Sequence, residues 1–197
     1  MHRRRFLRTT LEGSAALFVS LPFAGCASVA GGATADASCL PRTEDNIEGP
    51  FFLAGAPDRA NLAVEGEPGV RLGVSGVVRD GGCRPIAGAV IEVWHADANG
   101  EYDNAGYVHR GVLRCDAVGR YDLATIVPGH YLNGPTYRPA HVHMKVYGHG
   151  QPVLTTQLYF PGDPYNDNDP FIRSSLLLSD LRTQTDGSQT ARFDFVL

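Results

Sequence analysis

Residues 70–78 read Val-Arg-Leu-Gly-Val-Ser-Gly-Val-Val, and residues 87–95 read Ala-Gly-Ala-Val-Ile-Glu-Val-Trp-His. The first stretch alternates apolar residues with small or polar ones, as in a strand with one buried face. The second is rich in the β-branched and aromatic residues that strands prefer. Asp-Gly-Gly at 80–82 and Asp-Ala-Asn-Gly at 97–100 follow them as turn signals. These two strand-and-turn units predict a β protein.

The rest of the chain repeats this organisation. We predict further strands at residues 119–126, 140–147, 154–160 and 190–196, whereas helical periodicity is weak and confined to 172–181. The 23 glycines and 13 prolines show no period and fit many turns between short strands. We therefore expect an all-β fold, an antiparallel β-sandwich of short strands with long loops.

Composition narrows the class of function. At 197 residues, 43% hydrophobic and 19% charged, the chain is neither disordered nor a long membrane bundle. Its formal charge of −4 argues against a nucleic-acid binder, which would show a basic face. The four cysteines lack the paired spacing of a zinc ribbon. In an oxidising compartment one disulfide could form among Cys39, Cys83 and Cys115, and the spacing does not choose the pair.

The N-terminal residues are typical of a targeting segment. His-Arg-Arg-Arg-Phe-Leu-Arg at 2–8 precedes a short apolar stretch at 13–25. As a helix that stretch would span only about 20 Å, less than the roughly 30 Å of a bilayer core. A basic start before a short apolar stretch indicates an export signal, and Arg3 and Arg4 resemble the pair of a twin-arginine signal. We predict such a signal over residues 1–25.

Export divides the chain into three parts. Phe-Ala-Gly-Cys at 23–26 resembles a bacterial lipobox, which would lipidate Cys26 and attach the protein to a membrane; the alternative is ordinary cleavage near residues 27–30. Residues 26–43, rich in small residues, predict a flexible tether, and 44–197 the folded domain. Either alternative implies a periplasmic or cell-envelope protein of a bacterium.

The sharpest chemical motif is Arg-Pro-Ala-His-Val-His at 138–143. Residues i and i+2 of a strand share a face, so His141 and His143 are predicted to project side by side. Imidazole is the commonest metal ligand, and two on one face form half of a metal site. The motif alone also fits two solvent-facing histidines. The nearest further ligands upstream are Tyr131 and Tyr137, and Tyr102 follows the turn at 97–100.

Taken together, these segments resemble the intradiol ring-cleavage dioxygenases, a family that includes protocatechuate 3,4-dioxygenase and catechol 1,2-dioxygenase. The resemblance covers residues 44–165 and rests on six motifs in the family's order. The motifs are Ile-Glu-Gly-Pro-Phe-Phe at 47–52, Glu-Val-Trp-His-Ala-Asp at 92–97 ending in Gly-Glu-Tyr at 100–102, Gly-Arg-Tyr at 119–121, Ile-Val-Pro-Gly-His-Tyr at 126–131, Arg-Pro-Ala-His-Val-His at 138–143 and Thr-Gln-Leu-Tyr-Phe at 156–160.

The resemblance implies non-haem Fe(III) bound by two tyrosinates and two histidines. The positions that match those ligands are Tyr102, Tyr131, His141 and His143. Arg138 matches an arginine beside the substrate ring, Gln157 matches a glutamine of the same pocket, and Tyr131 would take up a substrate proton. The implied reaction cleaves a catechol with O2 between its two hydroxyl-bearing carbons and gives a cis,cis-muconate-type diacid.

The chemistry of these ligand types agrees with the resemblance. A tyrosine is a tyrosinate at neutral pH only if its pKa is lowered by about three from the free value, which requires about 4 kcal/mol of stabilisation of the anion. A trivalent cation beside the phenolate supplies this stabilisation. Hard phenolate oxygens favour Fe(III), and phenolate-to-iron charge transfer predicts a red protein. Two alternatives stay open: a non-catalytic transthyretin-like binding sandwich, which residues 74–94 also resemble, and a catalytically silent relative with a blocked pocket.

Substrate and oligomeric state stay open, a homo-oligomer included. Arg110, Arg114 and Arg120 are candidates for binding a substrate carboxylate, whereas Asn133 stands where protocatechuate enzymes tend to have Trp.

Residues beside the motifs have less specific interpretations. His95 is interpreted as structural or as a support behind the site residues, and His130 either lines the pocket or is solvated. Tyr137 is expected to border the entrance, and the acidic run 163–169 to be a solvated surface loop because it lacks EF-hand spacing. Residues 48–51 predict a tight turn that places 51–60 along the rim of the cleft.

Overall fold

The structure is a computed structural model that describes residues 41–197. The predicted export signal, Cys26 and the tether up to residue 40 lie outside the described residues. Within 41–197, no helix is long and apolar enough to cross a membrane.

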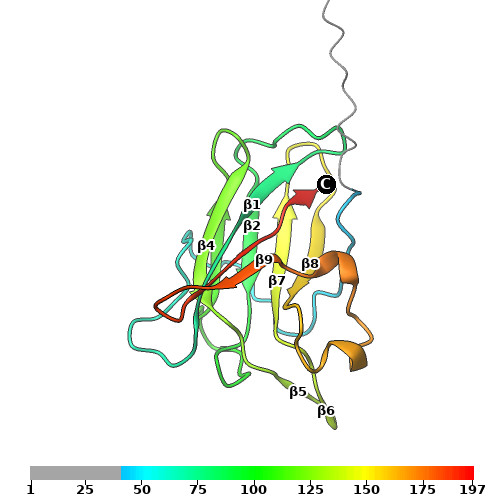
Figure 1. The fold of residues 1–197 in the computed structure, drawn as a ribbon. Coiled ribbons are helices and arrows are strands. Elements are labelled where there is room, and N and C mark those ends of the chain that lie inside the picture. Colours follow the sequence, from blue (N-terminus) through cyan, green and yellow to red (C-terminus); the bar gives the residue numbers. More distant parts are fainter. Residues whose placement is uncertain (1–40) are drawn as a thin grey trace, which may run out of the picture. The chain divides into compact units, whose positions relative to one another are not determined.

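Short strands dominate this part of the chain (Figure 1). They are β1 Arg71–Arg79, β2 Val90–Trp94, β3 Arg110–Arg114, β4 Arg120–Ile126, β5 Leu132–Asn133, β6 Thr136–Tyr137, β7 His141–Tyr147, β8 Leu154–Tyr159, β9 Ser179–Thr183, β10 Gln189–Arg192 and β11 Phe195–Val196. Two 3-10 turns complete them, η1 Asn166–Asn168 and η2 Ser174–Leu176. The predicted all-β class is confirmed.

The strands form two main sheets and a small hairpin. In the first sheet the order is β11-β1-β10-β9, and β4 pairs with β1. The second sheet has the order β3-β2-β7-β8, with every neighbouring pair antiparallel. β5 and β6 pair with each other as a separate hairpin.

The last strands differ in detail from the sequence prediction. The expected single strand at 190–196 is divided into β10 and β11, and both pair parallel with β1. Phe193 and Asp194 lie between them, and the Asp194 carboxylate accepts a hydrogen bond from the Val77 main-chain N–H at 3.0 Å. Because that side chain occupies a position of the strand ladder, the regular pairing is interrupted there.

The core lies between the two sheets, and strand alternation decides which residues enter it. Val74 of β1, Ile91 of β2, and Val142 and Met144 of β7 are at most 1% exposed and belong to one apolar cluster. The intervening residues of the second sheet, His143 among them, therefore point to its other face. On that outer face the candidate site is built.

Two further expectations are settled by the structure. Residues 172–181 form no α-helix: they contain the short 3-10 turn η2, with two residues between its end and the start of the strand β9. Among the cysteines, Cys83 is disulfide-bonded, whereas Cys115 is a free and buried thiol.

Candidate metal centre

A row of buried side chains crosses the outer face of the second sheet. The strand register places Arg110 of β3 opposite Trp94 of β2, Trp94 opposite His143 of β7, and His143 opposite Gln157 of β8. Each of these four residues is at most 2% exposed. His141 shares the face of His143, and their ring centroids are 4.8 Å apart. The predicted side-by-side histidines are thus confirmed.

The segment before β1 covers this row. The Gln157 side-chain amide donates a hydrogen bond to the Ile47 carbonyl at 2.7 Å, and the Phe52 ring lies 5.0 Å from that of Trp94. A side chain at Gly49, where φ is +72°, would place its Cβ 3.3 Å from His143 Cε1. The predicted turn at 48–51 therefore packs directly on a histidine, and the alternative of solvent-facing histidines is wrong.

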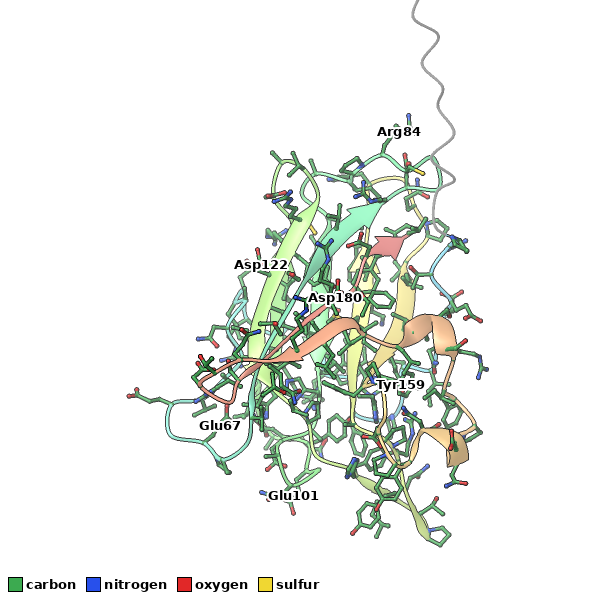
Figure 2. The ribbon with its side chains drawn as sticks, in the orientation of Figure 1. Glu67, Arg84, Glu101, Asp122, Tyr159 and Asp180 are labelled. Atoms are coloured by element: carbon green, nitrogen blue, oxygen red, sulfur yellow. The ribbon has the colours of Figure 1, made fainter. Side chains whose placement is uncertain are left out.

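The two tyrosine-bearing loops meet through their main chains. The Gly129 N–H donates to the Asp97 carbonyl at 2.8 Å. A Cβ at Gly100 would lie 2.2 Å from the His130 carbonyl oxygen, so only glycine fits where the loops touch. This contact brings the rings of Tyr102 and Tyr131 to 5.8 Å between centroids. The loops lie at the end of the sandwich marked by Glu101 in Figure 2, away from the end that carries Arg84.

Three donor atoms converge on one point. The Tyr102 hydroxyl oxygen is 3.3 Å from Nε2 of His141 and 3.2 Å from Nε2 of His143. The Tyr131 ring lies 6.0 Å from the His141 ring. Nδ1 of His141 donates to the Pro139 carbonyl at 2.7 Å, so the lone pair of its Nε2 faces the Tyr102 oxygen.

These residues fit a ferric ion. Two donors that each bind one ion at about 2 Å lie about 3 Å apart, which matches the Tyr102–histidine distances. Burial lowers the pKa of His141 to about 4 and that of His143 well below its usual value, so both imidazoles are in the neutral form that a metal ion requires of a ligand. Burial raises the pKa of Tyr102, so its phenolate needs a strong cation beside it. Within 41–197 no three His, Cys, Asp or Glu gather as a metal site, so a metal ion at this point would need tyrosine oxygens as further ligands.

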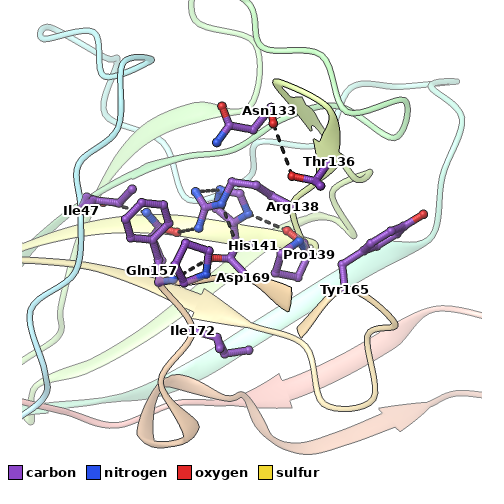
Figure 3. Close-up of polar contacts among 12 residues, drawn as sticks. Ile47, Asn133, Thr136, Arg138, Pro139, His141, Gln157, Tyr165, Asp169 and Ile172 are labelled. Carbon is purple, nitrogen blue, oxygen red and sulfur yellow. Dashed lines mark hydrogen bonds and ion pairs between the residues drawn. The ribbon is translucent and has the colours of Figure 1, made fainter. Parts of the chain in front are cut away.

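Arg138 is held against the donor cluster by four buried partners, Tyr159 among them, whose hydroxyl accepts from Nη2 at 3.3 Å (Figure 3 shows the contacts to His141, Gln157 and Asp169). Its Nε donates to Asp169 Oδ2 at 2.7 Å, and its Nη2 donates to Gln157 Oε1 at 2.9 Å. Nη1 lies 3.4 Å from Nε2 of His141. Gln157 Oε1 also accepts the Tyr159 hydroxyl at 2.9 Å. Gln157, predicted to line the pocket, therefore uses its carboxamide to hold Arg138.

The acidic run at 163–169 is not the solvated loop that we predicted. Asp169 is 7% exposed and is the partner of Arg138. Asp163 Oδ2 accepts the main-chain N–H of Ala140 at 3.1 Å and pairs with His130 at 2.8 Å. Both ends of the run thus support the strand entry to the histidines, and Asp167 between them is exposed. Loop composition could not reveal partners more than 20 residues away.

The remaining predicted residues have separate positions. His95 is structural, as expected: its buried ring bonds to Thr125 Oγ1 at 2.6 Å and to the Ala96 carbonyl at 2.7 Å. Tyr137 and Asn133 are exposed on the β5–β6 hairpin, which joins Tyr131 to Arg138.

None of the three candidate carboxylate binders presents a free guanidinium to the site. Arg114 is exposed and pairs with Asp58 at 3.5 Å, Arg120 is exposed on β4 of the other sheet, and Arg110 is buried against main-chain carbonyls.

Sequence reasoning missed two aromatic residues that pack on Tyr102 and His143. Phe51 stacks on Tyr102 with centroids 4.1 Å apart, and Trp94 stacks on His143 at 4.8 Å. Trp94 lies in a predicted strand, yet only the register between β2 and β7 identifies its partner. Phe51 lies in the predicted turn, and nothing local indicates which ring it covers.

Comparisons with known proteins agree with this site. A family model described as "Dioxygenase" matches residues 47–197. The 6-chlorohydroxyquinol 1,2-dioxygenase of Cupriavidus pinatubonensis is 39% identical over 183 residues, which cover 79% of this chain and 64% of that relative. The chain thus spans less than two thirds of that relative's length.

Solved structures match the fold as well. The dioxygenase domain of a dioxygenase–carbohydrate-binding protein fusion from Streptomyces sp. SirexAA-E is 42% identical, with a TM-score of 0.74 over 79% of this chain and 97% of that one. For 3-chlorocatechol 1,2-dioxygenase from Rhodococcus opacus the values are 31% and 0.73, over 78% and 71% of the two chains. The fold and the matches together place the chain in a dioxygenase family. The chain belongs to the intradiol ring-cleavage dioxygenase family, as its motifs predict.

Proposed function

We propose that this chain is a Fe(III)-dependent intradiol dioxygenase that cleaves a catechol-type ring with O2 between its two hydroxyl-bearing carbons, giving a cis,cis-muconate-type diacid. One observation carries the proposal: the Tyr102 hydroxyl lies within 3.3 Å of Nε2 of both His141 and His143. A binding sandwich without catalysis has no need for such a buried cluster of phenol and imidazole donors.

Each residue of the site has a role in this proposal. The ferric ion would be held by Tyr102, Tyr131, His141 and His143. A ferric ion held there would supply a Lewis acid to which both oxygens of a catechol could bind, and its charge would make the ring open to O2. The Tyr131 oxygen accepts a proton from a substrate hydroxyl. The Arg138 guanidinium, fixed by Asp169, stabilises negative charge that develops on the ring, an effect often of a few kcal/mol.

We further propose that the substrate ring carries no carboxylate. A buried carboxylate needs a cationic partner. Arg110 donates to main-chain carbonyls, Arg114 pairs with Asp58, and Arg120 belongs to the other sheet. Relatives named for 6-chlorohydroxyquinol and 3-chlorocatechol support a catechol with uncharged substituents.

Oxygen uptake by the iron-loaded protein tests this function. The panel is catechol, hydroxyquinol, 3-chlorocatechol and protocatechuate, with the diacid identified by mass. We expect one O2 consumed per ring for uncharged catechols and little turnover of protocatechuate. Tyr131→Phe should retain iron and slow turnover. Tyr137→Phe, which changes an exposed residue nearby, should leave the rate of turnover unchanged. A visible band that catechol shifts without O2 uptake would indicate a silent relative, and a protein that binds no iron would indicate a binding sandwich.

We also propose that the protein is exported through the twin-arginine signal at residues 1–25. Replacing Arg3 and Arg4 together by Lys should retain the protein in the cytoplasm, as measured by cell fractionation. Cys26→Ala then separates the two alternatives, because only a lipidated protein would leave the membrane fraction on this change. An unchanged location of the Arg3 and Arg4 double variant would contradict export by this route.

A further inference from the structure

Arg110, the first residue of β3, is a buried cation whose partners are all main-chain carbonyls. It is 1% exposed. Its Nε and Nη2 donate to the Asp103 carbonyl at 3.1 and 2.8 Å, and its Nη1 donates to the Phe51 carbonyl at 2.6 Å. Among residues 41–197 no carboxylate forms a salt bridge with it. Burying a charge is costly unless hydrogen bonds compensate it. An apolar side chain would fill the same space without that cost, so we infer that the hydrogen bonds of Arg110 have a role of their own.

Both carbonyls belong to the segments that flank the Tyr102 ring. Asp103 follows Tyr102 directly, and the Phe51 ring stacks on the Tyr102 ring with an interplanar angle of 14°. The loop after Tyr102 is itself rigid, because the Asp103 carboxylate accepts the main-chain N–H groups of Ala105, Gly106 and Val108 at 2.8 to 3.0 Å. One guanidinium thus joins the loop that carries the phenol to the segment that covers it.

The Tyr102 hydroxyl can serve the metal centre only if its place is fixed, since it must reach two imidazoles at 3.2 and 3.3 Å. We propose that Arg110 is a positioning residue that holds the Tyr102 phenol at the two histidines and thereby sets the affinity for Fe(III). The inference rests on the proposed metal centre. A lysine would retain the charge but not the planar fork that donates twice to one carbonyl and once to another.

The test measures iron binding rather than turnover. Metal-free protein is titrated with ferric nitrilotriacetate, and bound iron and the visible phenolate-to-iron band are followed. Arg110→Lys is expected to weaken Fe(III) binding by about 10- to 100-fold, the usual effect of losing a group that orients a ligand. The matched control is Arg114→Met, because Arg114 is on the same strand and face but exposed; it should change the affinity less than about twofold.

A double-mutant cycle decides whether Arg110 acts through Tyr102. If it does, Arg110→Lys should change Fe(III) affinity less than about twofold in a Tyr102→Phe background. An equal loss in both backgrounds, or no loss in either, overturns the inference. Urea unfolding of each metal-free variant separates loss of fold from loss of positioning, and Arg110→Gln replaces any variant that does not fold. If the unsubstituted protein binds no iron, the proposed function itself fails; a coloured, active protein that Arg110→Lys leaves unchanged refutes only the role of Arg110.

Discussion

Replacing Asp169 by Asn tests how the structure holds Arg138. The pair is almost dry, with side chains 6% and 0% exposed and a 2.7 Å bond from Arg138 Nε to Asp169 Oδ2. In the present structure the Phe171 N–H donates to Asp169 Oδ1 at 2.8 Å, and the Oδ1 of an Asn could still accept this bond. The amide nitrogen of the Asn would then face Arg138 Nε, so that two N–H donors would point at each other. Removing one partner of a buried pair costs about 3–5 kcal/mol. Because Gln157 still accepts a hydrogen bond from Arg138, we expect Asp169→Asn to lower the free energy of unfolding by about 3 kcal/mol, the lower end of this range.

The assay is urea unfolding of the metal-free protein. Asp167→Asn is the matched control, because Asp167 is in the same loop and exposed, and it should cost less than about 0.5 kcal/mol. In an Arg138→Gln background, Asp169→Asn should cost less than about 1 kcal/mol, since no buried guanidinium is then left unpaired. If Asp169→Asn lowers the free energy of unfolding by less than about 1 kcal/mol when Arg138 is present, or by the same amount with and without Arg138, the reasoning is refuted.

Three further predictions concern pH, loop contact and thiol reactivity. Burial lowers the pKa of His95 from 6.5 to about 3, so between these values only the unfolded chain is protonated there, and His95 makes stability fall with falling pH by up to about 1.4 kcal/mol per unit, in addition to the same effect at His141 and His143; His95→Gln should remove its share of the slope in urea unfolding of metal-free protein, and an unchanged slope contradicts the assignment. Gly100→Ala should cost over about 2 kcal/mol and weaken iron binding, whereas Gly134→Ala, with φ also positive but open space around it, should cost about 1 kcal/mol; equal effects would contradict the contact between the two loops. Burial raises the pKa of the Cys115 thiol to about 11, so this thiol should react with Ellman's reagent only after unfolding. The unsubstituted protein should therefore release more chromophore than Cys115→Ala when unfolded and the same amount when folded; a fast reaction of Cys115 in the folded protein would contradict its burial.

Local sequence patterns predicted the features that depend on alternation along one strand. Because β7 is regular, the spacing of His141 and His143 was enough to place both rings on one face. The turn at residues 97–100 was equally predictable, since Asp, Asn and Gly favour turn conformations over a continued strand. The resemblance to the family then supplied Tyr102 and Tyr131 as partners, which spacing alone left open.

The features that depend on register or on distant segments were not predictable in this way. The strand β3 begins and ends with arginine, so its charges obscured the pattern, and Arg110 could not be recognised as buried. The burial of Asp169 follows from a partner 31 residues away. The cover over His143 comes from residues near Gly49, which local sequence places only in a turn.

The visible spectrum of the iron-loaded protein, compared with those of Tyr102→Phe and Tyr131→Phe, is the most direct measurement. Two phenolate ligands predict a red protein with one iron per chain, and each substitution should weaken and shift the charge-transfer band. A colourless protein that holds stoichiometric iron, or a band that neither substitution alters, would show that the phenols of this site do not bind the metal.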